Sequence, residues 1–143
     1  MSNSLYERDF YAWANEQAAL LRAGDFSAAD IENIAEELDT LGRGEQRELT
    51  SRLASVLALL LAWEAMPEQR GRHSSLAIRQ KRVSVSRLLN ESPSLRTQLP
   101  TILEDAYGDA VLIAARELDR DEEDFPAVSP WTFDQAMTGD LTA

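Results

Sequence analysis

The stretch Leu53–Trp63 reads LASVLALLLAW, and it decides the fold. At about 100° per residue, its apolar side chains point in nearly every direction around a helix. A helix that is apolar on all sides is buried on all sides, so we expect this segment at the centre of a helical bundle. Its 11 residues fall short of the roughly 20 that a membrane-spanning helix needs, so we predict no membrane segment.

One broad apolar face continues upstream of this stretch, through Ile31, Leu38 and Leu49. The spacing of three and four residues predicts a long helix over about residues 28–65, roughly 55 Å in length. We expect Ser27 to cap the N-terminus of this helix and Pro67 to end it. Two glycines at 42 and 44 predict a bend or a break within this helix.

Helical periodicity and capping signals define the remaining elements. Gly24 marks the end of the first helix, and the pairs Ser92-Pro93 and Ser129-Pro130 each signal a fresh start. The expected helices cover about residues 5–23, 74–90, 100–118 and 131–137. We therefore predict an all-α bundle of four main helices plus a short C-terminal helix. It forms a single domain over residues 1–143, with an ordered core from about 5 to 137 and short flexible ends.

The composition limits the chemistry that is open to the chain. It has 143 residues and no cysteine, which excludes disulfides, thiolate metal sites and a cysteine nucleophile. The opening residues, MSNSLYERDFYAW, lack the basic and apolar regions of a signal peptide. Both observations favour a cytoplasmic location.

The net charge of −11 is distributed unevenly. Residues 69–90 hold six basic residues and no acid, whereas residues 1–68 carry −8 and residues 91–143 carry −9. A strongly acidic chain repels phosphate at long range, which argues against nucleic-acid binding. The basic segment serves one of two purposes: it binds an anion, or it neutralises acidic helices of the same bundle.

The best anion site in the sequence combines three arginines with two neighbours at the end of the long helix. Arg79 and Arg82 are one turn apart and could fork around a phosphate or carboxylate. The full candidate set is Arg70, Arg79, Arg82, Trp63 and Glu64. The alternative, which the opposite charges of the segments favour, is that these arginines pair with the acidic first half of the long helix. The only histidine, His73, has no partner in a metal motif and is interpreted as a loop residue.

Carboxylates suggest two further sites. Glu45 falls inside the apolar face, so we expect a buried carboxylate that pairs with Arg52 or a neighbouring helix, unless the glycines shift the phase of the helix. Glu32, Glu36 and Asp39 lie on adjacent turns and could bind a hard cation through oxygen. Such a row is more often a solvated face, so no metal and no cofactor is predicted.

Several separate signatures occur in an order that is typical of one family. They read SLYERDFYAWANEQAALLRAGDF, IAEELDTLGRGEQREL, LAWEAMPEQR and SPSL, followed by FP and SPWTF. Over about residues 5–137 the chain resembles the DUF29 family of small bacterial proteins. The resemblance implies a compact all-α domain and assigns no activity, so no catalytic residue is carried over. The Ile-Arg-x-x-Arg pattern of that family is kept at Ile78, Arg79 and Arg82.

No phosphate-binding loop, dinucleotide fingerprint or serine-hydrolase elbow occurs in the sequence. We therefore expect a non-enzymatic interaction module that binds a protein partner or a second copy of itself. The first alternative is binding of an anion, a nucleotide or a nucleic acid by residues 70–87. The second is a small metal-dependent enzyme that uses Glu45 or the cluster around Glu36.

Overall fold

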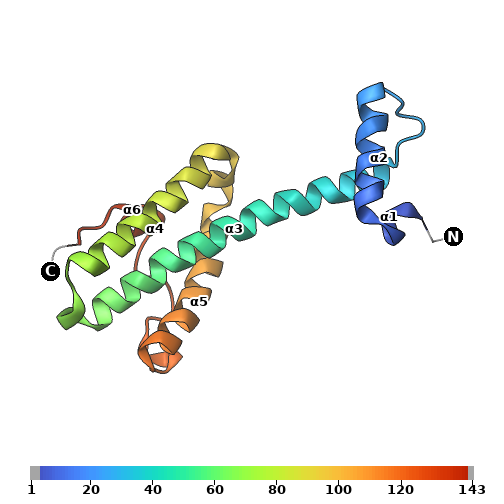
Figure 1. The fold of residues 1–143 in the computed structure, drawn as a ribbon. Helices are drawn as coiled ribbons and strands as arrows, with labels where there is room; N and C mark the ends of the chain where they lie inside the picture. The colour runs from blue at the N-terminus through green and yellow to red at the C-terminus, as the bar shows by residue number, and fades with distance from the viewer. Residues whose placement is uncertain (1–3, 142–143) are drawn as a thin grey trace. The chain divides into compact units, whose positions relative to one another are not determined.

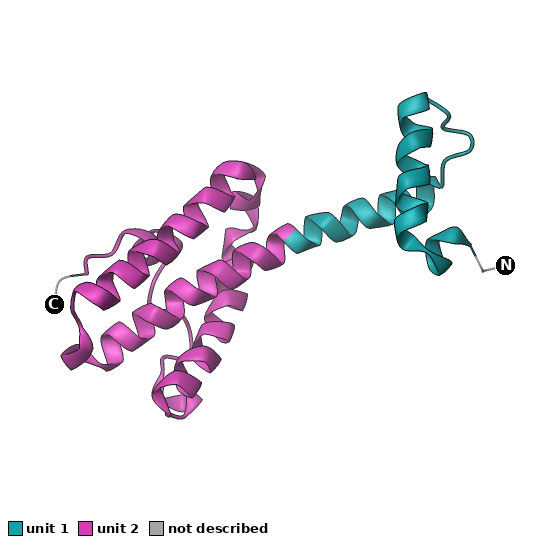
Figure 2. Ribbon diagram, in the orientation of Figure 1, with its two compact units in different colours: residues 1–44 teal, residues 45–143 magenta. Residues whose placement is uncertain are grey.

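The computed structural model describes residues 4–141, which form helices joined by short turns (Figure 1). No strand occurs within these residues, so the predicted all-α fold is confirmed. The chain divides into two compact units, unit 1 at residues 1–44 and unit 2 at residues 45–143 (Figure 2). In chain order the helices are α1 (Leu5–Arg8), α2 (Phe10–Ala23), α3 (Ile31–Ala65), η1 (Pro67–Gln69), α4 (Arg72–Glu91), η2 (Pro93–Gln98), α5 (Leu99–Leu118), η3 (Glu122–Asp124) and α6 (Phe133–Thr138).

The core of unit 2 surrounds the second half of α3. Leu53, Val56 and Leu57 have no exposed surface, and most of their neighbours up to Trp63 are also buried. One apolar cluster joins this stretch to buried residues of α4, α5 and α6. The central place predicted for the stretch is therefore correct, because only burial on several sides accommodates a helix that is apolar all round.

Unit 1 consists of α1, α2 and the first half of α3. The predicted single helix over residues 5–23 is wrong, because Asp9 leaves the helical conformation and separates α1 from α2. The side chain of Asp9 accepts a hydrogen bond from the backbone N–H of Ala12 at 3.1 Å, which caps α2. Gly24 ends α2 in the left-handed conformation at φ 76°, as its position in the sequence predicts.

The long helix α3 is continuous, and the predicted break at Gly42 and Gly44 is absent. Each glycine costs a helix roughly 1 kcal/mol relative to alanine, which 35 residues of hydrogen bonds can absorb. The boundary between the two units follows Gly44. The helix begins at Ile31, and the hydroxyl of Ser27 donates to Asp25, so Ser27 does not open it.

The C-terminal segment is held on unit 2 by specific contacts. The hydroxyl of Tyr107 on α5 donates to the carbonyl of Pro126 at 2.6 Å, and Phe125 is buried. Thr132 caps α6 by accepting from the backbone N–H of Gln135 at 3.1 Å. The predicted cap at Ser129 is wrong, because that hydroxyl contacts the backbone of Trp131.

Candidate interaction surface

An aromatic cluster and a network of hydrogen bonds hold the helices of unit 1 together. The rings of Tyr6 and Trp13 meet edge to face at a centroid distance of 4.7 Å, and Phe10 lies 5.4 Å from Trp13. The indole Nε1 of Trp13 donates to Asp30 at 3.0 Å, and the backbone N–H of Asp30 donates to Gln17 at 2.7 Å. These contacts join α2 to the start of α3.

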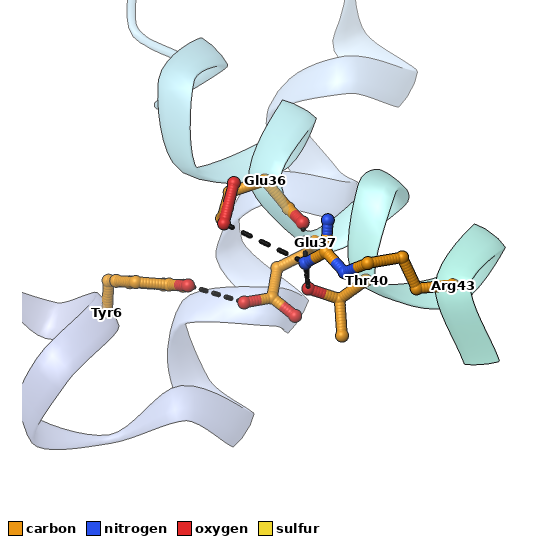
Figure 3. Close-up of polar contacts among 5 residues, drawn as sticks. All are labelled: Tyr6, Glu36, Glu37, Thr40 and Arg43. Carbon is orange, nitrogen blue, oxygen red and sulfur yellow. Dashed lines mark hydrogen bonds and ion pairs between the residues drawn. The ribbon is translucent and has the colours of Figure 1, made fainter. Parts of the chain in front are cut away.

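Two side chains of this network have shifted acidities. Hydrogen bonds from Asn33 and then from Trp13 stabilise the carboxylate of Asp30 and hold its pKa below the usual value. The Tyr6 hydroxyl donates to Glu37 (Figure 3), and this bond raises the pKa of Tyr6 to about 12. Both shifts favour the protonation states that keep the network intact near neutral pH.

The carboxylates of α3 take part in separate polar contacts (Figure 3). Arg43 lies 4.0 Å from Glu36 and donates to Thr40 at 3.1 Å. The predicted cation site at Glu32, Glu36 and Asp39 is not supported, because residues 4–141 contain no group of three or more possible ligands around one metal position. The three side chains instead lie on the exposed surface of the helix.

The apolar face of α3 changes its environment along the helix. In unit 2 it is core, with Leu49 and Leu53 at 0% exposure. In unit 1 the same face continues as Ile31 at 53%, Leu38 at 63% and Leu41 at 68% exposure. We call these three residues the α3 seam; together with half-buried Ile34 they follow the alternating three- and four-residue spacing of a coiled-coil seam. The sequence predicted this face, but not that its first half is exposed.

The surroundings of the α3 seam are acidic. Unit 1 contains nine acidic and three basic residues, for a net charge of −6. Glu32 follows Ile31 in the sequence, and Asp39 follows Leu38. Both carboxylates are exposed. The α3 seam is therefore an apolar strip flanked by carboxylates.

Arg70, the first arginine of the predicted anion site, has internal partners. Its Nε donates to the carbonyl of Trp63 at 2.7 Å, and its guanidinium lies 5.5 Å from the centre of the Trp63 ring. Arg70 also forms an ion pair with Glu64 at 3.5 Å. Its side chain therefore lies against the C-terminal end of α3. A pocket of about 210 Å³ adjoins it, lined in part by His73, which lies at the start of α4 and is exposed.

The other two arginines of that set have different surroundings. Arg82 is half-buried, and its Nε donates to the carbonyl of Ala136 on α6 at 2.9 Å. Burial lowers the pKa of Arg82, and its Nη2 is buried without a hydrogen-bond partner in the described part of the chain. Arg79 is exposed. Within the described residues the structure thus gives the three guanidiniums no common partner, and the fork of Arg79 and Arg82 around one anion stays a prediction.

An exposed strip runs along α4 and includes Arg79. Arg72, Leu76, Arg79, Val83 and Arg87 are spaced by three or four residues and are all exposed; we call them the α4 stripe. Among the described residues of unit 2, no carboxylate forms an ion pair with Arg72, Arg79 or Arg87. The two apolar residues of the stripe, Leu76 and Val83, have exposures of 45% and 49%.

The model of the family described as domain of unknown function DUF29 matches residues 5–142. The chain belongs to the DUF29 family. No curated protein and no solved structure matches it. The described helices of this DUF29 protein include none that is long and apolar enough to cross a membrane.

The buried carboxylate predicted at Glu45 of this DUF29 protein is not found. Glu45 is exposed and accepts a hydrogen bond from the hydroxyl of Ser92 at 3.1 Å. Arg52 pairs instead with Glu48, one turn before it, at 2.9 Å, and it also donates to the carbonyl of Ser84 on α4. Glu45 is exposed because the core around α3 begins only at Leu49.

Two larger grooves lie on the surface of unit 2. One, of about 370 Å³, is lined by Phe125 and Trp131 together with Glu64 and Arg120. The other, of about 320 Å³, lies between α3, α4 and α5 and is mostly apolar.

Proposed function

We propose that this DUF29 protein is a non-enzymatic protein-interaction module that binds its partner on the α3 seam. The observation that carries the proposal is the exposure of Ile31, Leu38 and Leu41, each more than half open to solvent. Covering the exposed parts of these side chains would contribute roughly 3–5 kcal/mol, at about 1.5–3 kcal/mol for a fully buried leucine or isoleucine. Exposed apolar strips rimmed by charge are typical of protein-binding surfaces.

The charge of unit 1 defines the chemistry of the partner. A net charge of −6 repels acidic surfaces and attracts basic ones. The spacing of the α3 seam fits another helix better than an extended strand, because its residues recur at three and four positions. We therefore infer that the partner presents a helix with apolar side chains among arginines or lysines.

The proposal treats the whole chain as one functional domain that acts in the cytoplasm. The family match extends over both units, which supports a shared role for them. The lack of cysteine suits a reducing compartment.

Photo-crosslinking tests the proposal directly. Leu38 is replaced by benzoylphenylalanine, and the protein is irradiated in the cells that produce it. We expect covalent products with a protein, either a second copy or another chain. The matched control carries the same group at Val128 in unit 2, which is 77% exposed, and should give none. If position 38 gives no more product than position 128, the proposed surface is wrong.

A further inference from the structure

The α4 stripe has the chemistry that the proposed function requires of the partner. Its two apolar residues, Leu76 and Val83, lie seven residues apart on one face of a 20-residue helix. Arginines at 72, 79 and 87 alternate with them along the same face. The stripe is therefore an apolar strip among cations, whereas the α3 seam is an apolar strip among carboxylates.

The opposite side of α4 packs into the core of unit 2, so the stripe faces solvent. Ile78, Val85, Leu88 and Leu89 are buried in the core of unit 2. Arg82 adds a hydrogen bond to the backbone of α6. Because α4 is held along its length, the backbone that carries the stripe is already ordered before a partner binds. Binding therefore costs little conformational entropy in this helix.

We propose that the partner is a second copy of this chain, with the α3 seam of each copy on the α4 stripe of the other. This inference rests on the proposed function. Two reciprocal contacts of this kind make a closed pair with two-fold symmetry. Pairing between two α3 seams is disfavoured, because it would bring two units of −6 together. Each contact between seam and stripe joins opposite charges instead.

A nucleic acid is the competing occupant of the α4 stripe, since arginines bind phosphate as readily as carboxylate. The observations favour the protein partner for two reasons. The chain as a whole carries −11, which opposes approach to a polyanion. Leu76 and Val83 lie on either side of Arg79 in the stripe, where they would gain nothing from a phosphate backbone.

Sedimentation velocity on the whole chain at low salt tests the inference by measuring mass. We expect a species of twice 16.0 kDa that dissociates as salt is raised, because the attraction between the two faces is screened. Reversing the stripe by Arg79→Glu with Arg87→Glu should weaken the pair by roughly tenfold or more. Reversing the acidic flank by Glu32→Lys with Asp39→Lys should do the same.

The decisive variant combines all four changes in one chain, because it exchanges the charges of both faces. We expect it to pair like the original protein. The matched control is Arg116→Glu on α5, where the side chain is 80% exposed and outside the stripe; it should leave pairing unchanged. All the substituted side chains are exposed, and circular dichroism checks that each variant is folded.

Each other outcome rejects the inference. A protein that stays monomeric at low salt rejects pairing, and so does a four-fold variant that fails to recover it. If the chain is monomeric and position 38 crosslinks to a different protein, the proposed function stands and only self-pairing fails. If an unlabelled DNA or RNA oligonucleotide binds the monomer and Arg79→Glu with Arg87→Glu abolishes binding, the α4 stripe is a nucleic-acid surface.

Discussion

Unit 1 and unit 2 share one helix but differ in what covers it. In unit 2 the apolar face of α3 belongs to a single cluster of 21 buried residues, 12 of which come from other segments and cover it. In unit 1 only Trp13 and Gln17 are buried among the described residues, and the same face of α3 is exposed. The apolar pattern of a helix therefore shows which face can be covered, and its neighbours decide whether the chain itself covers that face.

The two units are also held together by different forces. Unit 2 depends on apolar burial, which scales with area and is insensitive to pH. Unit 1 depends on hydrogen bonds from Trp13, Tyr6 and the backbone of Asp30, together with a three-ring cluster. Few buried contacts and exposed polar ones are the features of a region that opens at low free energy.

The first test places the same charge on the same helix in both units. Leu53→Asp puts a carboxylate where the side chain has no exposure, so we expect a loss of at least about 4 kcal/mol in the free energy of unfolding. Leu38→Asp alters a side chain that is 63% exposed, and we expect a change within about 0.5 kcal/mol in the monomer. Urea denaturation measures both. Similar losses would show that the α3 seam is covered within the monomer.

The second test asks whether unit 1 can open while unit 2 stays folded. Trp13→Ala removes a side chain that is 5% exposed, at a cost of about 3 kcal/mol. We expect hydrogen exchange to become fast in α2 while the amides of α3 after Leu49 and of α5 keep their protection. If exchange rises equally in both units, they unfold as one cooperative body.

The third test uses acid to weaken unit 1 selectively. Because the pKa of Asp30 is lower in the folded protein, its stabilising contribution is full above the ordinary pKa of 3.8. That contribution is lost as the pH falls through the lower, folded value. The indole Nε1–H resonance of Trp13 should therefore keep its position down to a pH below 3.8 and then move. In Asp30→Asn this acid step should be missing; a step at the ordinary value would contradict the hydrogen bond.

The smallest expected effect is at alkaline pH. The pKa of Tyr6 is raised from 10.0 to about 12, so its contribution is full below pH 10 and is lost as the pH rises to about 12. Ultraviolet titration of the phenolates should show late ionisation of Tyr6 together with Tyr107, whose pKa is also raised by burial. The late component should fall by one tyrosine in Tyr6→Phe, and an unchanged late component would contradict the assignment.

Much of the fold follows from particular residues of the sequence. Gly24, Pro67 and Pro93 end or start helices where predicted, because the left-handed turn and the locked φ angle are local properties. Ser27 and Ser129 were wrong as caps, since a nearby Asp25 and the backbone of Trp131 compete for their hydroxyls. The break at the two glycines was wrong because the hydrogen bonds of a long helix outweigh local preference.

The candidate surfaces were harder to predict than the helices. The wheel placed Ile31 and Leu38 on an apolar face, but exposure depends on whether another helix lies over that face, which no local pattern contains. The sequence did not show that Arg70 turns back onto α3 after Trp63, or that Arg82 contacts α6, 54 residues away in the chain, because both contacts depend on packing. Charge counting identified the basic segment correctly, and packing decided which of its arginines stay exposed.

The bond between Tyr107 and Pro126 has a practical consequence for anyone who shortens the chain. Residues 119–124 are exposed and mostly acidic, so they resemble a dispensable tail. The segment that follows is anchored, with Phe125 and Ala136 in the core and the carbonyl of Pro126 accepting from α5. A protein truncated after Leu118 would expose apolar surface on α5 and would tend to aggregate. Sites for cleavable tags or fusions are better chosen after Leu141, since that side chain still packs against the core.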